Sequence, residues 1–425
     1  MSGLASRNTI VAGTILLLAV TGGVFFLAPY GSLEPIKVGI LHSETGTMAI
    51  SEKSVRDATL LAIEEINERG GLLGRKIAPV VVDGASDSRT FAAAAERLIV
   101  EEHVSVVFGC WTSASRKSVL PIFEEHQHLL FYPVQYEGLE QSPNIVYTGA
   151  APNQQLVPAV KWCFDELNAR RFFLVGSDYV FPRTASEIMT AQITALGGAV
   201  VGERYLLLTR SDHGAIEAIV KEIVDVRPDV ILNTINGESN VAFFQQLRAA
   251  GVTPEDIHTM SFSIAEDELR SMDAQAMAGD YTTWNYFQSI QRKENEAFVA
   301  NFRRKYGGHR VTDDPIEAGY FGVHLWAQAV QDAGTDNVAA VRKRLSNQSY
   351  PAPGGIVSID PENQHTWKTV RVGRIRSDGQ FDIVWTSENP VRPLPFPDSK
   401  SRLQWEESLA ELFERWDKSW ANPGP

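Results

Sequence analysis

The sequence predicts an α/β fold of two lobes, in which each lobe is a doubly wound, mostly parallel sheet and a cleft separates the lobes. Three observations support this prediction. Short apolar runs such as residues 104–108 and 129–131 are bounded by turn residues and alternate with helical patterns, which is typical of buried parallel strands between helices. The strand–loop–helix series starts a second time after Pro152. The chain of 425 residues is also long enough for two such domains.

The first series begins with an apolar strand at residues 36–41, which a polar loop follows. Residues 54–68 form a helical pattern because Val55, Ala58 and Ala62 fall on one face. Crossovers between parallel strands are nearly always right-handed, so this series predicts a doubly wound layer. The remaining elements are expected at 77–82 (strand), 91–100 (helix), 104–108 (strand), 115–126 (helix) and 129–131 (strand).

The second series repeats this architecture without a detectable sequence repeat. Its elements are expected at 171–175, 200–207, 230–233 and 259–262 (strands), and from about 183 and over 238–250 (helices). Residues 281–287 have the pattern of a crossing between lobes. Helices at 314–333 and 338–345 are expected to return to the first lobe, and strands at 355–359, 370–375 and 381–385 to complete the second. The predicted lobes are therefore 36–152 plus 286–348, and 153–285 plus 349–396.

The N-terminal segment, residues 1–35, contains an uncharged apolar run at 10–28 with Arg7 before it. A run of about 19 residues is at the low end of what spans a bilayer and longer than the apolar core of a typical signal peptide. We expect an uncleaved signal anchor, with a cleaved signal peptide as the alternative. Either places the lobes on the extracytoplasmic or periplasmic side, and the first anchors them to the inner membrane.

Composition and motifs exclude several classes of function. A formal net charge of -13 argues against nucleic acid and anionic membrane surfaces as partners. The sequence lacks the nucleophile elbow, the H-E-x-x-H zinc motif, the P-loop and the Rossmann glycine fingerprint, so we expect neither an enzyme nor a cofactor or metal site. Cys110 and Cys163 are expected to be buried and reduced.

Two segments follow neighbouring strands and combine hydroxyls with aromatic rings: GCWTSASR at 109–116 and FYPVQYEG at 131–138. Ligands of open α/β sheets sit at the carboxyl ends of the strands, where both segments fall. Trp111, Tyr132 and Tyr136 can wall a small planar molecule. A helix capped at residues 112–115 leaves N–H groups free for a carbonyl oxygen. For either segment alone, ordinary strand-end aromatics beside a helix cap are the simpler interpretation.

Several segments together, in this order, resemble a known family: 39–43, 109–117, 131–138, 142–145, 149–154, 176–183 (GSDYVFPR) and 360–365 (DPENQH). They are similar to the type I periplasmic solute-binding proteins of the branched-chain amino-acid type. Within that family, Trp111 and Val134-Gln135 resemble the urea-binding components of ABC transporters, because the related amide sensors typically carry Tyr and Thr-Pro there. The resemblance implies a protein that captures urea or a short amide by lobe closure and delivers it to an ABC permease. A membrane-tethered amide or urea sensor and a branched-chain amino-acid binder are the alternatives.

The resemblance also implies the ligand-binding residues. From the first lobe these are Trp111, Thr112, Ser113, Tyr132, Pro133 and Gln135. Donors are expected from Ser113 and the helix N-terminus, and acceptors from carbonyls near residues 133–135. Tyr179 and Phe181 of the second lobe would close over the ligand. Glu238 and Ser263, at strand ends of that lobe, are further candidates, for which capping or surface solvation is the simpler role.

Residues 397–425 form a linker and an amphipathic tail helix beyond the family pattern. Its apolar stripe comprises Trp405, Leu409, Leu412, Phe413, Trp416 and Trp420. Three roles are open: packing back on the lobes, docking on a partner or second copy, and lying on a membrane. The excess of glutamate on the opposite face disfavours the last.

Overall fold

The computed structural model of this chain describes residues 34–208 and 212–424. The predicted signal anchor at 10–28 lies outside the described residues. Among the residues that are described, no helix combines the length and the apolar character needed to cross a bilayer.

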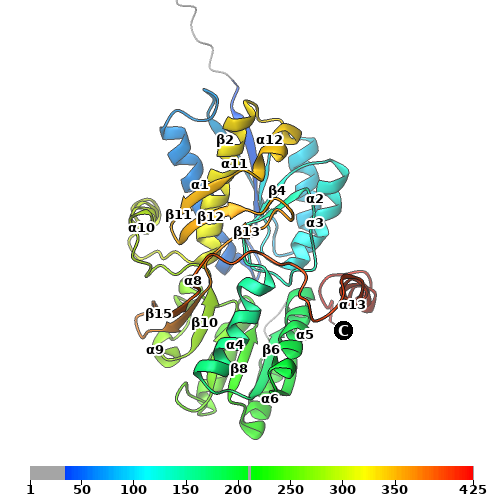
Figure 1. Ribbon diagram of the computed structural model, residues 1–425, viewed down its shortest axis with the longest axis vertical. Helices are drawn as coiled ribbons and strands as arrows, with labels where there is room; N and C mark the ends of the chain where they lie inside the picture. The colour runs from blue at the N-terminus through cyan, green and yellow to red at the C-terminus, as the bar shows by residue number, and fades with distance from the viewer. Residues whose placement is uncertain (1–33, 209–211, 425) are drawn as a thin grey trace, which may run out of the picture. The chain divides into compact units, whose positions relative to one another are not determined.

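The first lobe is built on a five-stranded parallel sheet with the order β2-β1-β3-β4-β5. Its strands are β1 (Ile36–His42), β2 (Ile77–Asp83), β3 (Val107–Gly109), β4 (Leu130–Tyr132) and β5 (Ile145–Tyr147). Helices α1 (Ala49–Glu68) and α11 (Asp314–Ala333) pack together on one face, and α2 (Ser88–Val100) and α3 (Ser113–Glu125) on the other (Figure 1). Central strands are apolar on both faces because helices cover both.

Gly109 ends β3 at a point of close backbone approach. A Cβ there would lie 2.1 Å from the carbonyl oxygen of Leu41 in β1, so no larger residue fits. The next residue, Cys110, has a positive φ of 65° and donates its N–H to that same oxygen at 2.9 Å. This turn directs residues 111–113 out of the sheet edge.

The second lobe is built on a seven-stranded sheet with the order β15-β14-β10-β9-β8-β6-β7. Its strands are β6 (Arg171–Ser177), β7 (Ala199–Leu206), β8 (Val230–Thr234), β9 (His258–Ser261), β10 (Tyr281–Trp284), β14 (Arg371–Ile375) and β15 (Phe381–Thr386). The strands from β7 to β10 are parallel, and β14 and β15 add antiparallel. Its helices are α4 (Leu156–Glu166), α5 (Val180–Ala195), α6 (His213–Val226), α7 (Ser239–Ala249), α8 (Glu266–Leu269) and α9 (Ala274–Met277). The predicted two-lobed, mostly parallel α/β fold is confirmed.

One late strand lies elsewhere than predicted. Strand β12 (Gly355–Ile359) was expected to complete the second-lobe sheet, but it pairs with β11 (Ser349–Ala352) and β13 (Thr366–Trp367) in a separate three-stranded sheet. The physical reason is burial: Val357 and Ile359 belong to the hydrophobic core of the first lobe. Connecting elements are η1 (Pro152–Gln154), α10 (Lys293–Tyr306) and α12 (Val338–Leu345).

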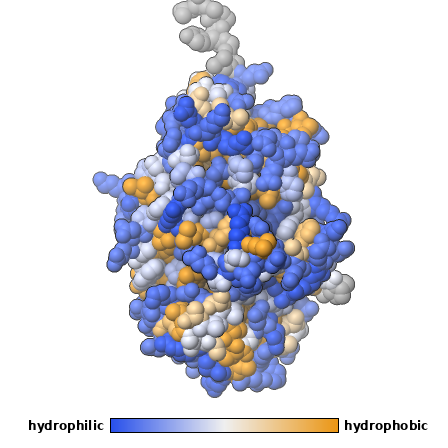
Figure 2. Space-filling model, turned by 45° about the vertical axis from the view of Figure 1, so that its right-hand side comes forward, coloured by the Kyte–Doolittle hydropathy of each residue, from blue (hydrophilic) through white to orange (hydrophobic). Residues whose placement is uncertain are grey.

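The tail packs back on the second lobe, which is the first of the three roles considered for its apolar stripe. Helix α13 (Arg402–Arg415) lies beside α5 (Figure 1), and Trp405, Leu409 and Trp416 join the core that α4 and α5 build. Trp405 is fully buried and donates its indole N–H to the carbonyl oxygen of Pro397 at 2.9 Å. On the face seen in Figure 2, the surface is mostly polar, with apolar side chains in small separate groups. Cys110 and Cys163 are buried and free, as predicted.

Candidate functional site

Trp111, Thr112 and Ser113 lie where β3 leads into α3. Thr112 is the N-cap of that helix, and its hydroxyl oxygen accepts the N–H of Ser115 at 3.0 Å. Trp111 is 3% exposed, and its indole nitrogen is buried without a hydrogen-bond partner among the described residues. The helix N-terminus and the indole N–H thus supply donors at the carboxyl edge of the first sheet.

Tyr132, Pro133 and Gln135 follow the neighbouring strand, β4. The Tyr132 hydroxyl donates to the carbonyl oxygen of Trp111 at 2.7 Å, which ties the two strand ends together. Pro133 lies within the first lobe near His42, Phe108 and Thr148, where the described residues leave no space for a water molecule. Gln135 reaches the other lobe, because its Nε2 donates to the carbonyl oxygen of Phe262 at 2.8 Å. Its Oε1 is buried without a partner in the described part of the chain.

A buried ionic network of Arg116, Lys117, Glu137 and Glu140 supports this edge of the sheet. Arg116 binds Glu137 (Nη2–Oε1, 2.9 Å) and Glu140 (Nε–Oε1, 2.8 Å), and Lys117 binds Glu140 (Nζ–Oε2, 3.0 Å). Ser113 donates its hydroxyl to Glu137 and accepts from Arg116 Nη1 at 3.1 Å. What Ser113 offers a ligand in this arrangement is a hydroxyl oxygen, and donating to one would require exchanging the Glu137 contact.

Electrostatics hold this network in its charged form. Burial alone would raise the pKa of Glu140, but the charges of Arg116 and Lys117 outweigh it and lower the pKa to about 2. Burial opposes the charge of Arg116 as well, yet Glu140 and Glu137 hold its pKa well above the usual value. The two cations and two carboxylates therefore neutralise one another within the network. Buried pairs of this kind cost desolvation, so we assign the network a positioning role.

The second lobe has Tyr179 and Ser263 just past its strand ends, whereas Phe181, expected to close over the ligand, lies in the first turn of α5 and is buried in the core of that lobe. Tyr179 follows β6 and is 2% exposed, and its ring centroid lies 6.1 Å from that of Phe181 in the second-lobe core. Burial raises the pKa of Tyr179, and the nearby Tyr132 and Glu137 of the first lobe raise it further. Ser263 follows β9 next to Phe262, and its hydroxyl is buried without a partner among the residues described.

The structure brings most of the predicted residues to the meeting of the two sheet edges. The bond from Gln135 to Phe262 sets the end of β4 against the end of β9, where Ser263 lies. Glu238, like Phe181, lies elsewhere: it is exposed at the N-cap of α7, and its side chain makes no capping bond. Gly237 beside it faces the first-lobe loop at Thr47, so Glu238 stands at the rim of the lobe interface.

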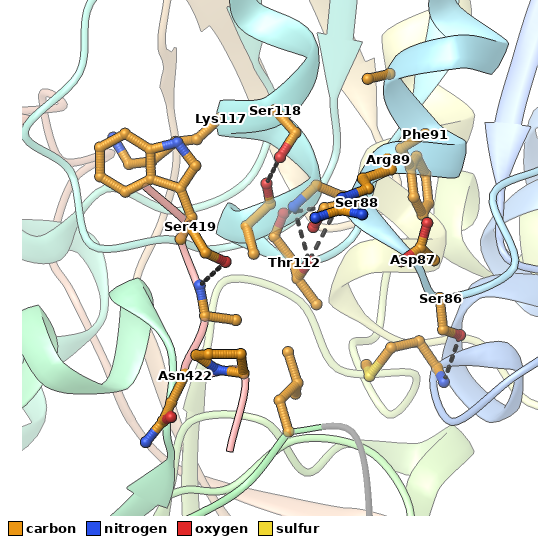
Figure 3. Close-up of a pocket in the computed structure, with 18 of the residues that line it drawn as sticks. Ser86, Asp87, Ser88, Arg89, Phe91, Thr112, Lys117, Ser118, Ser419 and Asn422 are labelled. Carbon is orange, nitrogen blue, oxygen red and sulfur yellow. Dashed lines mark hydrogen bonds between the residues drawn. The ribbon is translucent and has the colours of Figure 1, made fainter. Parts of the chain in front are cut away.

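A cavity of about 460 Å³ opens beside Thr112. Figure 3 shows Ser86, Asp87 and Arg89 of the first lobe on one side of it, and Ser419 and Asn422 of the tail across from them. Its walls thus combine the loops after β2 and β3 with residues of the tail. Among the described residues, no group of His, Cys, Asp and Glu side chains has the arrangement of a metal site.

Sequence reasoning missed the charged residues of the site. Arg116, Lys117, Glu137 and Glu140 lie within or next to the two aromatic segments singled out above, but their burial was not anticipated. Two cations at the end of one segment and two carboxylates at the end of the other, both beside apolar strands, are the signal that predicts a buried network. Tyr136, expected as a wall of the site, is instead in van der Waals stacking with Tyr147, with ring centroids 5.2 Å apart.

Comparison with known protein families gives a match over most of the chain. Residues 36–402 match the model of a family described as periplasmic binding protein domain. The Leu/Ile/Val-binding protein homolog 6 of Brucella melitensis biotype 1 is 24% identical over 377 residues, which cover 84% of this chain and 93% of that protein. A limonene hydroxylase of Geobacillus stearothermophilus is 33% identical over 124 residues, which cover 29% of this chain and only 23% of that protein.

Solved structures share the fold. A solute binding protein of an ABC transporter from Rhodopseudomonas palustris BisB5, in complex with 3,4-dihydroxybenzoic acid, has a TM-score of 0.77 at 22% identity and covers 84% of this chain and 99% of that one. The leucine binding protein LivK from Thermotoga maritima has a TM-score of 0.72 at 21% identity, covering 83% and 98%. The relatives that match most of the chain are named as binding proteins, not as enzymes.

Proposed function

Because this chain belongs to the periplasmic binding protein family and has its type I fold, we propose that it captures urea, or a short amide, between its lobes and delivers it to an ABC transporter. The observation that carries the proposal is a set of uncharged polar atoms, buried and unpaired among the described residues: Trp111 Nε1, Gln135 Oε1 and Ser263 Oγ. Buried polar groups are nearly always hydrogen-bonded, so a ligand is the natural partner. These atoms offer a donor, an acceptor and a hydroxyl, which match the carbonyl and NH2 groups of urea.

The charges near the site favour a neutral ligand over an amino acid. Asp178, which could have held an α-ammonium group, forms an ion pair with Arg183 at 2.7 Å. Arg116, which could have held a carboxylate, is paired with Glu137 and Glu140. Binding a zwitterion would therefore require breaking the partly buried Asp178–Arg183 pair and the buried pairs of Arg116, and the latter is costly. Glu238 is exposed at the rim and remains the charged candidate for an amino-acid ligand.

The size of the ligand limits its affinity. A ceiling of about -1.5 kcal/mol per heavy atom gives about -6 kcal/mol for a ligand of the size of urea or acetamide. This corresponds to a Kd of the order of tens of micromolar. Affinity at this ceiling requires nearly every polar group of the ligand to be satisfied, which a site of several unpaired buried atoms supports.

Urea and acetamide differ in one NH2 group, which acetamide replaces by methyl. A site that accepts hydrogen bonds from the second NH2 rejects the methyl, because the buried acceptor is left unpaired, and such discrimination reaches about 10⁴ in favourable cases. We therefore propose urea over acetamide, with the acceptor at Gln135 Oε1 and the carbonyls near residues 133–135.

A branched-chain amino-acid binder is the second candidate, and it rests on the relatives named as Leu/Ile/Val-binding proteins. Thermal unfolding of the full chain with urea, acetamide and leucine separates the two. A ligand at about 100 times its Kd stabilises the folded state by about 2.7 kcal/mol. We expect millimolar urea to raise Tm by several degrees, acetamide less and leucine not at all. A rise in Tm with leucine and not with urea would show that the branched-chain amino-acid binder is the correct candidate.

Transport and sensing share this site and differ in output. We propose an extracytoplasmic location with anchoring by residues 10–28 and an ABC permease as partner, with a membrane-tethered sensor as the alternative. Uptake of labelled urea by cells that carry or lack the gene tests this. Unchanged uptake together with urea binding by the purified protein would favour the sensor.

A further inference from the structure

The tail continues past α13 as residues 417–423, which we call the strap; it begins with a turn in which Asp417 and Lys418 have positive φ. Helix α13 fixes the root of the strap to the second lobe through Trp405 and Trp416. The strap itself also binds that lobe: Val180 donates its N–H to the carbonyl oxygen of Trp420 at 3.0 Å, and an antiparallel bridge joins Tyr179 to Ala421. These contacts lie at the strand end that presents Tyr179 to the site.

Asn422 adds two further bonds on the same side. Its N–H donates to the carbonyl oxygen of Asp178 at 2.9 Å, and its Nδ2 donates to Asp178 Oδ2 at 2.7 Å. Asp178 is held in turn by Arg183. The strap is thus bound by backbone and side chain to the loop between β6 and α5.

The strap reaches the first lobe at Trp420, which also packs against the core cluster that includes Ala114 of α3. The Lys117 ammonium lies 4.8 Å from the centroid of the Trp420 ring, within the range of a cation–π contact. Lys117 belongs to α3 and is held by Glu140 in the network beneath Ser113. One residue of the strap therefore touches the ionic network of the first lobe while its neighbours are bonded to the second.

The strap also walls the cavity beside Thr112. Ser419, Trp420 and Asn422 line it from the tail, opposite Ser86 and Arg89 of the first lobe (Figure 3). A ligand that passes through this cavity towards Thr112 must move past the strap. Any widening between the lobes at this edge must also separate Trp420 from Lys117.

We propose that the strap is a clasp: it holds the two lobes together at the cavity beside Thr112 and slows the exchange of ligand. The clasping of the lobes does not depend on which ligand binds, whereas the effect on urea exchange rests on the proposed function. The two parts are measured separately.

Lobe separation is measured by pulsed electron spin resonance in the full chain without ligand. Spin labels are placed through Arg97→Cys in α2 and Lys221→Cys in α6, whose native side chains are 52% and 76% exposed. Cys110 and Cys163 are buried and label poorly. The variants are Trp420→Ala, a replacement of residues 418–422 by a Gly-Ser segment of equal length, and the control Leu403→Ala, an exposed residue of α13.

We expect both strap variants to broaden the distribution of label distances towards longer values, and Leu403→Ala to match the parent. Stopped-flow measurement with urea as the probe should show dissociation about fivefold faster in Trp420→Ala, as loss of one partly exposed cation–π contact implies. A strap that only stabilises the second lobe would lower Tm and leave the distances unchanged, which would overturn the clasp. If the segment replacement fails to fold, Trp420→Ala decides, because it keeps the backbone bonds. If no variant binds urea while the distances shift, the urea proposal falls and the clasp stands.

Discussion

Replacing Gln135 by alanine removes two contacts at once, one between the lobes and one to the proposed ligand. The amide nitrogen donates to the carbonyl oxygen of Phe262 at 2.8 Å, and the amide oxygen is the buried acceptor assigned to urea. Phe262 keeps a second donor in Gln155, at 3.2 Å, so its carbonyl is not left unpaired by the change. The substitution therefore isolates what Gln135 itself contributes.

The magnitude follows from the two contacts. A net intramolecular hydrogen bond contributes about 1 kcal/mol, and leaving an N–H of the ligand unpaired in a buried site costs about 1–3 kcal/mol. The sum is about 2–4 kcal/mol, which corresponds to a loss of urea affinity of roughly 30- to 1000-fold. Starting from tens of micromolar, the Kd of the variant should be in the millimolar range or weaker.

Titration calorimetry of the full chain with urea measures this change, with Gln155→Ala as the matched control. Gln155 donates to the same carbonyl oxygen and, at 2.8 Å, to that of Thr283, but is assigned no ligand contact. We expect the control to bind urea within about fivefold of the parent. Equal losses in the two variants, or an unchanged Kd in Gln135→Ala, would refute the assignment of Gln135 to the ligand.

Three further predictions concern stability. Because its pKa is lowered, ionised Glu140 contributes about 3 kcal/mol to the free energy of unfolding above its unfolded pKa, and this contribution is lost as the pH falls from about 4.5 to about 2. Acid unfolding followed by circular dichroism should show this loss, and Glu140→Gln should remove that part of the pH dependence. Burial, together with Asp267, raises the pKa of Glu268 to about 7. The stability that protonated Glu268 contributes to the fold is therefore complete below its unfolded pKa and is lost as the pH rises through about 7. A Tm that falls over this range in the parent and equally in Glu268→Gln would contradict this. Trp405→Ala should lower the free energy of unfolding by about 3–5 kcal/mol in denaturant titrations because the ring is fully buried, whereas Leu403→Ala, which is 65% exposed, should change it by about 0.5 kcal/mol or less.

Local periodicity was enough to predict most of the fold. The helices over 314–333 and 338–345 have the predicted bounds, because strong apolar faces and caps such as Asp313 define them. Helix α6 was missed, although Ile216, Ile219 and Ile223 share one buried face. The placement of β12 could not be predicted, since the pattern of a strand does not specify which sheet it joins.

The site was predicted through aromatic and hydroxyl residues at strand ends, and its charges were missed for a physical reason. Whether Arg116 and Glu137 are solvated or buried depends on whether they meet across the sheet edge, which is a tertiary contact between segments 21 residues apart. The position of Tyr136 was missed for the same reason: its hydroxyl contacts Glu140 and His365, and His365 lies far along the chain. The packing of the tail on α5 likewise depends on a complementary face that the stripe alone does not identify.

A crystal structure of the full chain grown with urea tests the central claim most directly, because the claim is where one small neutral ligand lies. We expect one planar molecule between the lobes, within hydrogen-bond distance of Trp111 Nε1, Gln135 Oε1 and Ser263 Oγ. A structure in which these three atoms are satisfied by protein groups while urea is absent from the interface would contradict it.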